Sequence, residues 1–191
     1  GADPADREGL PAITADMVDE GTGSLSALDV AEAIARIGAE YDVDVGPDAT
    51  VFMVTTLARL AARGASLLGD LLIRPSLRDG DFDRVRQLRL DRLRQLKDLP
   101  PAVAERAFLR LLYGTHPYGH LALGSDEALR AMRVEETGRF HAATFQPHRA
   151  TVGDAGPELQ RLHPRGDLLP VARRQVRPAG EELLVARQFL R

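Results

Sequence analysis

One pair of histidines and one set of three acidic residues in this sequence have spacings that could support metal binding. His116 and His120 are four residues apart, the spacing at which two imidazoles on one helix face can hold zinc. Pro117 and Gly119 lie between them, however, and these residue types favour a turn over a helix. We therefore interpret both histidines as structural loop residues. A zinc metallohydrolase that uses His116, His120 and His141 is the alternative.

The other candidate groups also favour structural roles. His141 follows Phe140 on a predicted helix, where we expect a partly buried, hydrogen-bonded imidazole. Glu40, Asp42 and Asp44 alternate with apolar residues, so they should share the solvent-facing side of a strand instead of binding a cation. The chain has no Gly-x-Ser-x-Gly nucleophile motif and no glycine-rich phosphate loop.

Composition excludes several classes of protein. The 191 residues suit one domain, or one domain plus part of another, and contain no cysteine for disulfides, thiolate zinc sites or nucleophilic catalysis. No apolar run reaches the length of a membrane span. Because 28 acidic residues outnumber 25 basic ones, binding to nucleic acid is disfavoured. Lys97 is the only lysine, and an arginine-rich surface favours contacts with carboxylates of peptides or proteins.

Hydrophobic periodicity predicts the elements that would position these residues. Ser26 and Asp29 form a capping-box pattern, and the alternating segment from Tyr41 to Val45, a turn and the β-branched run from Val51 to Leu57 predict a hairpin. Helices are predicted over 9–19, 27–37, 60–71, from Asp81 to the Pro100-Pro101 pair, 102–112, a short stretch after Ser125, 134–143 and 182–190; a further strand begins at Arg149. This pattern favours an α+β fold in which helices pack on one face of an antiparallel sheet.

Seven segments then occur in a characteristic order within residues 1–154. They are Asp3–Leu10, Glu20-Gly21-Thr22, Gly38-Ala39 before the hairpin, the Leu-Arg-Leu helix, Lys97-Asp98-Leu99-Pro100, His116-Pro117-Tyr118-Gly119, and Phe145-Gln146-Pro147 with Val152-Gly153-Asp154. In combination they resemble a domain of the pitrilysin/insulinase-like (M16) zinc peptidases, which include the mitochondrial processing peptidases. The resemblance implies the metallohydrolase fold of LuxS and the processing peptidases, in an incomplete form.

The catalytic motif of that family is absent at the matching positions. Catalytic members carry His-x-x-Glu-His on the first helix, where two histidines bind zinc and the glutamate activates water, and a distant glutamate completes the coordination. The resemblance places Ala12 and Asp16 at the two histidines and Ala15 at the general base. Counting back from Pro100 places Arg92 at the distant glutamate. Alanine has no donor atom and arginine is permanently charged, so we predict no metal or other cofactor, and a salt bridge between Asp16 and Arg92.

The resemblance therefore implies a noncatalytic domain that pairs with a catalytic zinc peptidase domain or subunit and helps to enclose a peptide or protein substrate in a chamber. The family's arginine and tyrosine for substrate binding cannot be placed on this chain. A stand-alone peptide-binding module is a further alternative. Residues 155–191 contain four prolines and scattered arginines, so we predict an irregular or poorly ordered tail after a domain of residues 1–154. No compartment follows from the sequence.

Overall fold

The computed structural model describes residues 7–154 and, as backbone, residues 181–189. The helices are α1 (Leu10–Asp16), α2 (Ala27–Arg36), α3 (Ala61–Ile73), α4 (Asp79–Lys97), α5 (Pro100–Tyr113), α6 (Asp126–Ala131) and α7 (Val134–Thr144), with 3-10 turns η1 (Ala58–Leu60), η2 (Pro117–Gly119) and η3 (Pro147–Arg149). The strands are β1 (Gly21–Thr22), β2 (Leu25–Ser26), β3 (Glu40–Val45), β4 (Ala49–Leu57), β5 (Ala150–Asp154) and β6 (Glu181–Phe189). Within these residues, no helix combines the length and apolar content of a membrane span.

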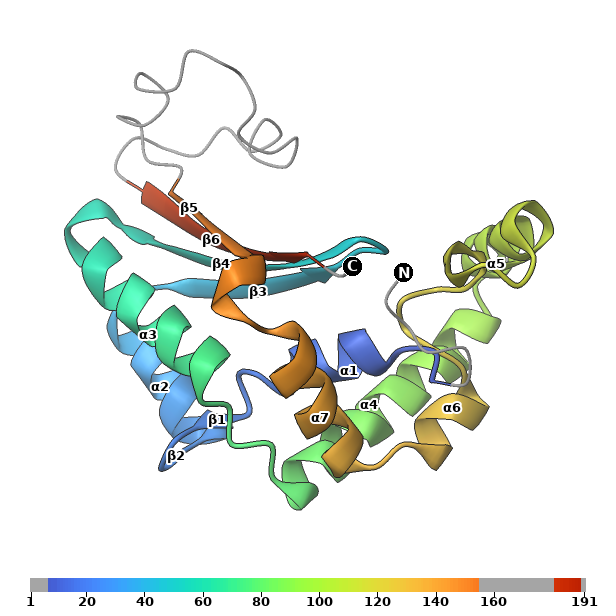
Figure 1. Ribbon diagram of the computed structural model, residues 1–191, viewed down its shortest axis with the longest axis horizontal. Helices are drawn as coiled ribbons and strands as arrows, with labels where there is room; N and C mark the ends of the chain where they lie inside the picture. Colours follow the sequence, from blue (N-terminus) through green and yellow to red (C-terminus); the bar gives the residue numbers. More distant parts are fainter. Residues whose placement is uncertain (1–6, 155–180, 190–191) are drawn as a thin grey trace, which may run out of the picture.

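The main sheet has four antiparallel strands in the order β3-β4-β6-β5. Strands β3 and β4 form the predicted hairpin, in which Val43 pairs with Phe52 and Tyr41 with Val54. These four side chains share one face of the sheet, because directly opposite residues project to the same side. Helices α1, α2, α3 and α7 lie on one side of the sheet (Figure 1). The predicted α+β fold is therefore confirmed.

Strand β6 corrects the helix predicted over 182–190. It lies between β4 and β5, with nine residue pairs to β4 and five to β5, so both of its edges are hydrogen-bonded. A short apolar run such as Leu183 to Ala186 fits either a buried strand or a helix, and the pairing on both sides decides for the strand. The sheet of the predicted domain, residues 1–154, thus also contains residues 181–189 as a strand. The predicted irregular segment 155–180 lies outside the described residues.

Local signals explain where helices α2 and α5 begin. The predicted capping box starts α2: the Ser26 hydroxyl accepts a hydrogen bond from the Asp29 backbone (3.3 Å), and the Asp29 carboxylate accepts one from the Ser26 backbone (2.8 Å). Helix α4 begins at Asp79, two residues before the predicted cap at Asp81. Pro100, predicted only to end the preceding helix, also opens α5, since proline needs no hydrogen-bond acceptor at a first helical position.

Helix α1 lies between two hydrophobic clusters. One joins it to α4 and α6, and the other joins it to α2, α3 and the sheet. The first contains Leu10, Ile13, Met17, Phe82, Val85, Leu90, Leu93, Ala128, Leu129 and Met132. The second contains Ala15, Val18, Val30, Phe52, Val54, Leu68 and Leu71. Because α1 contributes to both, side chains at its end are held in a fixed place between α4 and the sheet.

Candidate functional site

The positions that the resemblance matches to the catalytic motif lie on α1, at the centre of the molecule. Ala12 and Ala15 are both buried, and Ala15 is part of the cluster under the sheet. Their methyl groups therefore fill core space and offer no lone pair to a metal or to water. Of the three predicted positions on α1, only Asp16 carries a functional group, and its side chain is 39% exposed.

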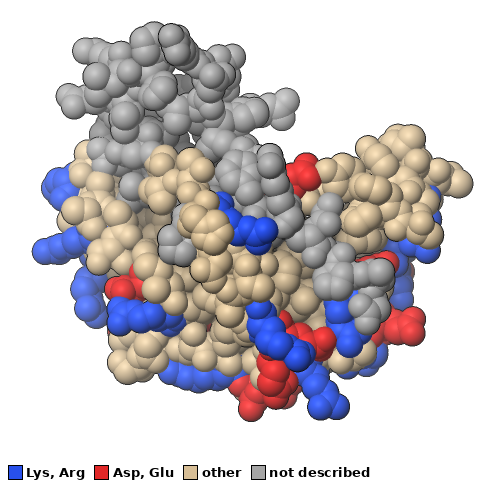
Figure 2. Space-filling view, in the orientation of Figure 1, with Lys and Arg blue, Asp and Glu red and all other residues tan. Residues whose placement is uncertain are grey.

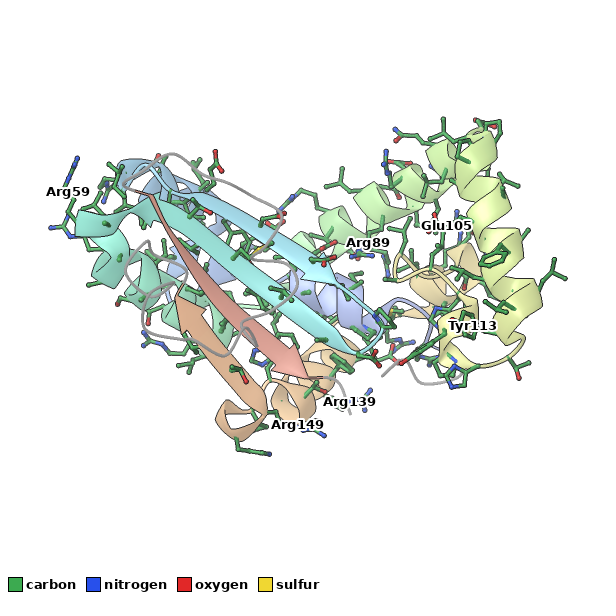
Figure 3. All side chains as sticks on the ribbon, turned by 90° about the horizontal axis from the view of Figure 1, so that it is seen from above. Arg59, Arg89, Glu105, Tyr113, Arg139 and Arg149 are labelled. Carbon is green, nitrogen blue, oxygen red and sulfur yellow. The ribbon has the colours of Figure 1, made fainter. Side chains whose placement is uncertain are left out.

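Asp16 pairs with Arg89 of α4, not with the predicted Arg92. The Arg89 Nε atom donates to Asp16 Oδ2 at 2.6 Å, and a second guanidinium nitrogen donates to the Leu123 carbonyl at 3.3 Å. The Arg89 side chain is only 9% exposed, whereas Arg92 is exposed and contacts Gln95 on its own helix. Figure 3 shows Arg89 on the side of α4 that faces the centre of the molecule.

The rotation of α4 explains this correction. Its buried side chains are Phe82, Val85, Arg89, Leu90 and Leu93, and at 100° per residue Arg89 falls near the middle of that stripe. The Arg92 position falls about 80° to one side, at the margin of the stripe. Counting back from Pro100 therefore identified the correct helix, but it selected Arg92 instead of Arg89, which lies about one helical turn earlier.

More charged groups surround this pair. We define the α1–α4 polar cluster as Asp16, Asp19, Glu20, Tyr41, Arg84 and Arg89. Glu20 forms an ion pair with Arg84, so two ion pairs connect the end of α1 and the following turn to α4. Arg84 also lies 3.8 Å from Asp81 on its own helix. The cluster therefore joins two helices by charge at the place where the resemblance puts a metal.

Asp19 and Tyr41 are the members of this cluster whose pKa values are raised by burial. Burial raises the pKa of Asp19 to about 6, and the neighbouring carboxylates of Glu20 and Asp16 add to that rise. Burial likewise raises the pKa of Tyr41, with the nearby charges of Asp19 and Asp16 as further causes. The Tyr41 hydroxyl is buried and has no hydrogen-bond partner among the described residues. Neither group was predicted as a site residue from the sequence, because the burial that shifts its pKa depends on tertiary packing.

The arrangement has the chemistry of a structural ion pair and not of a hydrolytic centre. Among the side chains that the structure describes, no three histidine, cysteine, aspartate or glutamate residues are grouped to hold a metal. Asp16 is engaged by a guanidinium, which already supplies the positive charge that a carboxylate attracts. The residues present do not fit a zinc ion.

The histidines lie in separate structural settings. His141 on α7 donates from Nε2 to the Leu72 carbonyl at 2.9 Å and stacks on Phe145, and burial lowers its pKa. This confirms the partly buried, hydrogen-bonded histidine that we predicted. His116 precedes η2 and accepts a hydrogen bond at Nδ1 from the Tyr118 backbone at 3.2 Å. The segment from His116 to His120 is a turn, as predicted, so the i, i+4 spacing does not place both rings on one helix face.

The acidic stripe of β3 is exposed, as predicted. Glu40, Asp42 and Asp44 alternate with Tyr41 and Val43, which pack against the core. The carboxylates therefore project from the face of the sheet opposite the helices. They give that face of the hairpin a local negative charge.

Comparison with known proteins agrees with the sequence resemblance. No protein-family model matches the chain. An uncharacterized zinc protease of Mycobacterium leprae is 26% identical over 140 residues, which cover 73% of this chain and 32% of the relative. An uncharacterized zinc protease of Streptomyces coelicolor is 23% identical over 195 residues, covering 90% of this chain and 41% of the relative. The chain is thus a distant homologue of these proteins and spans about a third of the length of the first.

A solved structure shows the same fold. The crystal structure of a peptidase M16 inactive domain from Pseudomonas fluorescens superposes with a TM-score of 0.67 at 22% identity, covering 74% of this chain and 36% of that one. This chain therefore has the fold of an M16 peptidase inactive domain. The resemblance read from the ordered sequence segments is confirmed.

Proposed function

We propose that this chain is a noncatalytic partner domain that pairs with a catalytic zinc metallopeptidase domain or subunit of the M16 type. Together the two would form a chamber around a peptide or protein substrate. The observation that carries this proposal is the Asp16–Arg89 ion pair, which occupies the end of α1 beside two buried alanines. A helix pair held together in this way keeps the fold without a metal.

The physical argument concerns what replaces zinc. A dication between two helices attracts carboxylates and holds the helices together. Here the Arg89 guanidinium attracts Asp16 and also donates to the Leu123 carbonyl, so one cation joins α1, α4 and the segment before α6. Zinc and this guanidinium would compete for the same carboxylate, and the arginine cannot lose its charge. The proposed role is therefore support of a partner's active site.

The exposed charges suit a surface that faces peptide. The acidic stripe of β3 lies on the exposed face of the hairpin, and α4 carries exposed arginines, of which Arg84 and Arg94 are paired with Glu20 and Asp91. Peptides carry ammonium groups, which an acidic stripe on a chamber wall can attract and orient. We assign these surfaces to the chamber as part of the proposal.

Two measurements test the proposal. The chain is mixed at micromolar concentration with an M16-type domain that has an intact His-x-x-Glu-His motif, and association is followed by sedimentation velocity. We expect a stable complex with higher cleavage of a fluorogenic extended peptide than the catalytic domain shows alone. A catalytic domain whose motif glutamate is changed to glutamine serves as the control: it should associate without cleaving.

Elemental analysis of the chain alone separates the alternatives. Stoichiometric zinc that is lost in His116→Ala or His120→Ala would overturn the proposal in favour of a metallohydrolase. Absence of any complex with the catalytic domain, together with calorimetric binding of extended peptides by the chain alone, would favour a stand-alone peptide-binding module.

A further inference from the structure

Helix α5 exposes large apolar side chains to an unusual degree. It has fourteen residues and none of them is buried. Leu111 is 87% exposed, Phe108 61% and Leu112 58%. It projects at one end of the molecule (Figure 1), and the corresponding lobe carries few charged atoms in the space-filling view (Figure 2). A contiguous apolar surface on a soluble domain marks a place of contact with another molecule.

The apolar residues occupy one side of the helix. We define the α5 face as Val103, Ala104, Ala107, Phe108, Leu111 and Leu112, all of them exposed. At 100° per residue these positions span about half of the helix circumference. The two half-buried residues of α5 after its prolines, Ala102 and Leu109, fall on the opposite half. The α5 face is therefore turned away from the other residues that the structure describes and is available to a second molecule.

The shape of this face suits a helix. Ala104 and Ala107 are small, and they lie between the larger side chains of Val103, Phe108 and Leu111. Small residues between large ones leave a groove into which the side-chain ridge of another helix can pack. The run from Val103 to Leu112 is about 14 Å long, which matches the anchors that a helix presents over two to three turns.

Charge defines one edge of the face. Arg106 and Arg110 lie side by side along the edge next to Val103. Among the side chains that the structure describes, neither guanidinium has an ion-pair partner. Glu105 lies at the other edge, beside Leu112. A partner with carboxylates along the matching edge would pair with both arginines, and such rim charges select the partner and its orientation.

We propose that the α5 face docks an amphipathic helix whose apolar stripe carries carboxylates along the edge that meets Arg106 and Arg110. An anionic membrane surface fits less well, because Glu105 borders the same stripe and would face the lipid phosphates. A second copy of α5 in antiparallel pairing would bring arginine edges together. This inference is independent of the proposed pairing with a catalytic domain, since it concerns a helix outside the α1–α4 polar cluster.

Two synthetic helical peptides test the docking site. Both have the same leucine stripe, but one carries glutamates along one edge and the other carries lysines at the same positions. Binding to the full 191-residue chain is measured by fluorescence anisotropy. We expect the glutamate-edged peptide to bind about tenfold more tightly or better, and the double variant R106E/R110E to reverse that preference.

A matched pair of neutral variants locates the apolar contact. Leu111→Gln should weaken both peptides about tenfold, because it removes the centre of the stripe. Leu88→Gln, which changes a 59% exposed leucine on α4, should leave both affinities unchanged. Equal binding of the two peptides, or binding that survives in Leu111→Gln, would overturn the proposal. So would a concentration-dependent dimer, or binding to phosphatidylglycerol vesicles, that Leu111→Gln abolishes.

Discussion

Helices α1 and α5 both have a proline in their first turn, yet they have opposite relations to solvent. Six of the seven residues of α1 are buried, and its one half-exposed residue, Asp16, is paired with a nearly buried arginine. None of the fourteen residues of α5 is buried, and Leu111 and Leu112 face water. The charged residue of α1 thus has its partner inside the chain. The apolar side of α5 has no partner within the described residues.

This contrast separates folding from binding. A buried guanidinium must be compensated by groups of the same chain, so changes in the α1–α4 polar cluster should alter the free energy of unfolding. An exposed leucine gives little to that free energy, so changes on the α5 face should alter association alone. The following predictions test this division, beginning with the largest expected effect.

Asp16→Ala should lower the free energy of unfolding by about 3 kcal/mol, because it leaves the nearly buried Arg89 cation without a carboxylate. Urea unfolding followed by circular dichroism measures this loss. Arg92→Ala serves as the matched control and should change stability by less than about 0.5 kcal/mol. If Arg92→Ala is the more damaging variant, the assignment of Arg89 is wrong.

The double variant Asp16→Ala with Arg89→Met should recover part of that loss. Replacing both charges removes the uncompensated cation and leaves an apolar side chain in a mostly apolar stripe. A double-mutant cycle from the same unfolding curves gives the coupling between the two residues. Additive effects would contradict a direct ion pair.

Gly124→Ala should lower the free energy of unfolding by about 2 kcal/mol. The residue has a φ of +88°, and a Cβ atom would lie 2.5 Å from the Glu8 carbonyl oxygen. The change would also disturb the Leu123 carbonyl, which accepts a hydrogen bond from Arg89. Gly23→Ala is the control, because Gly23 has a φ of +57° but open space around it, so only the backbone cost applies. Equal losses would show that the close approach at Gly124 is unimportant.

Asp19 should make the protein less stable as the pH rises from about 4 to about 6. Its pKa is about 6 in the folded state against 3.8 for the free side chain, so the folded state holds the proton more tightly and loses that advantage once the carboxyl ionises. Asp19→Asn should therefore stabilise the protein at pH 7.5 by one to two kcal/mol as an order of magnitude, since partial exposure reduces the full effect.

The pH series itself provides the check on Asp19. Thermal unfolding of both proteins between pH 4 and 8 should show curves that meet near pH 4 and separate as the pH rises. Glu20, Asp16 and Arg84 surround the group and act equally in both proteins, so the difference isolates Asp19. A constant difference across this range would contradict the raised pKa.

Leu111→Gln should have the smallest effect on stability, less than about 0.5 kcal/mol, since the side chain is already in water. The same unfolding measurement used for Asp16→Ala gives this value directly. A loss above 1 kcal/mol would mean that α5 packs within the chain and that its face is not available for docking.

Much of the fold could be predicted from the sequence because the deciding signals are local. The Ser26–Asp29 capping box specifies the start of α2, and alternation specifies the hairpin and its exposed carboxylates. The proline and glycine between His116 and His120 excluded a helical pair. The position of Arg89 on the buried side of α4 could also have been predicted, since it falls on the same helix stripe as Phe82, Val85 and Leu93. A count of residues from Pro100 was a weaker guide than that periodicity.

The sequence by itself therefore determined the local elements, because side-chain chemistry and short-range spacing need no neighbours. It also placed two alanines and one aspartate on the first helix at the positions that the resemblance matches to the zinc motif. Three other features depended on tertiary structure. Residues 181–189 became a strand because β4 and β5 pair with both edges. Asp16 pairs with Arg89 because the packing of α4 on α1 decides which side of α4 faces Asp16. Asp19 and Tyr41 acquired shifted pKa values because burial, which no local pattern encodes, removed water from both.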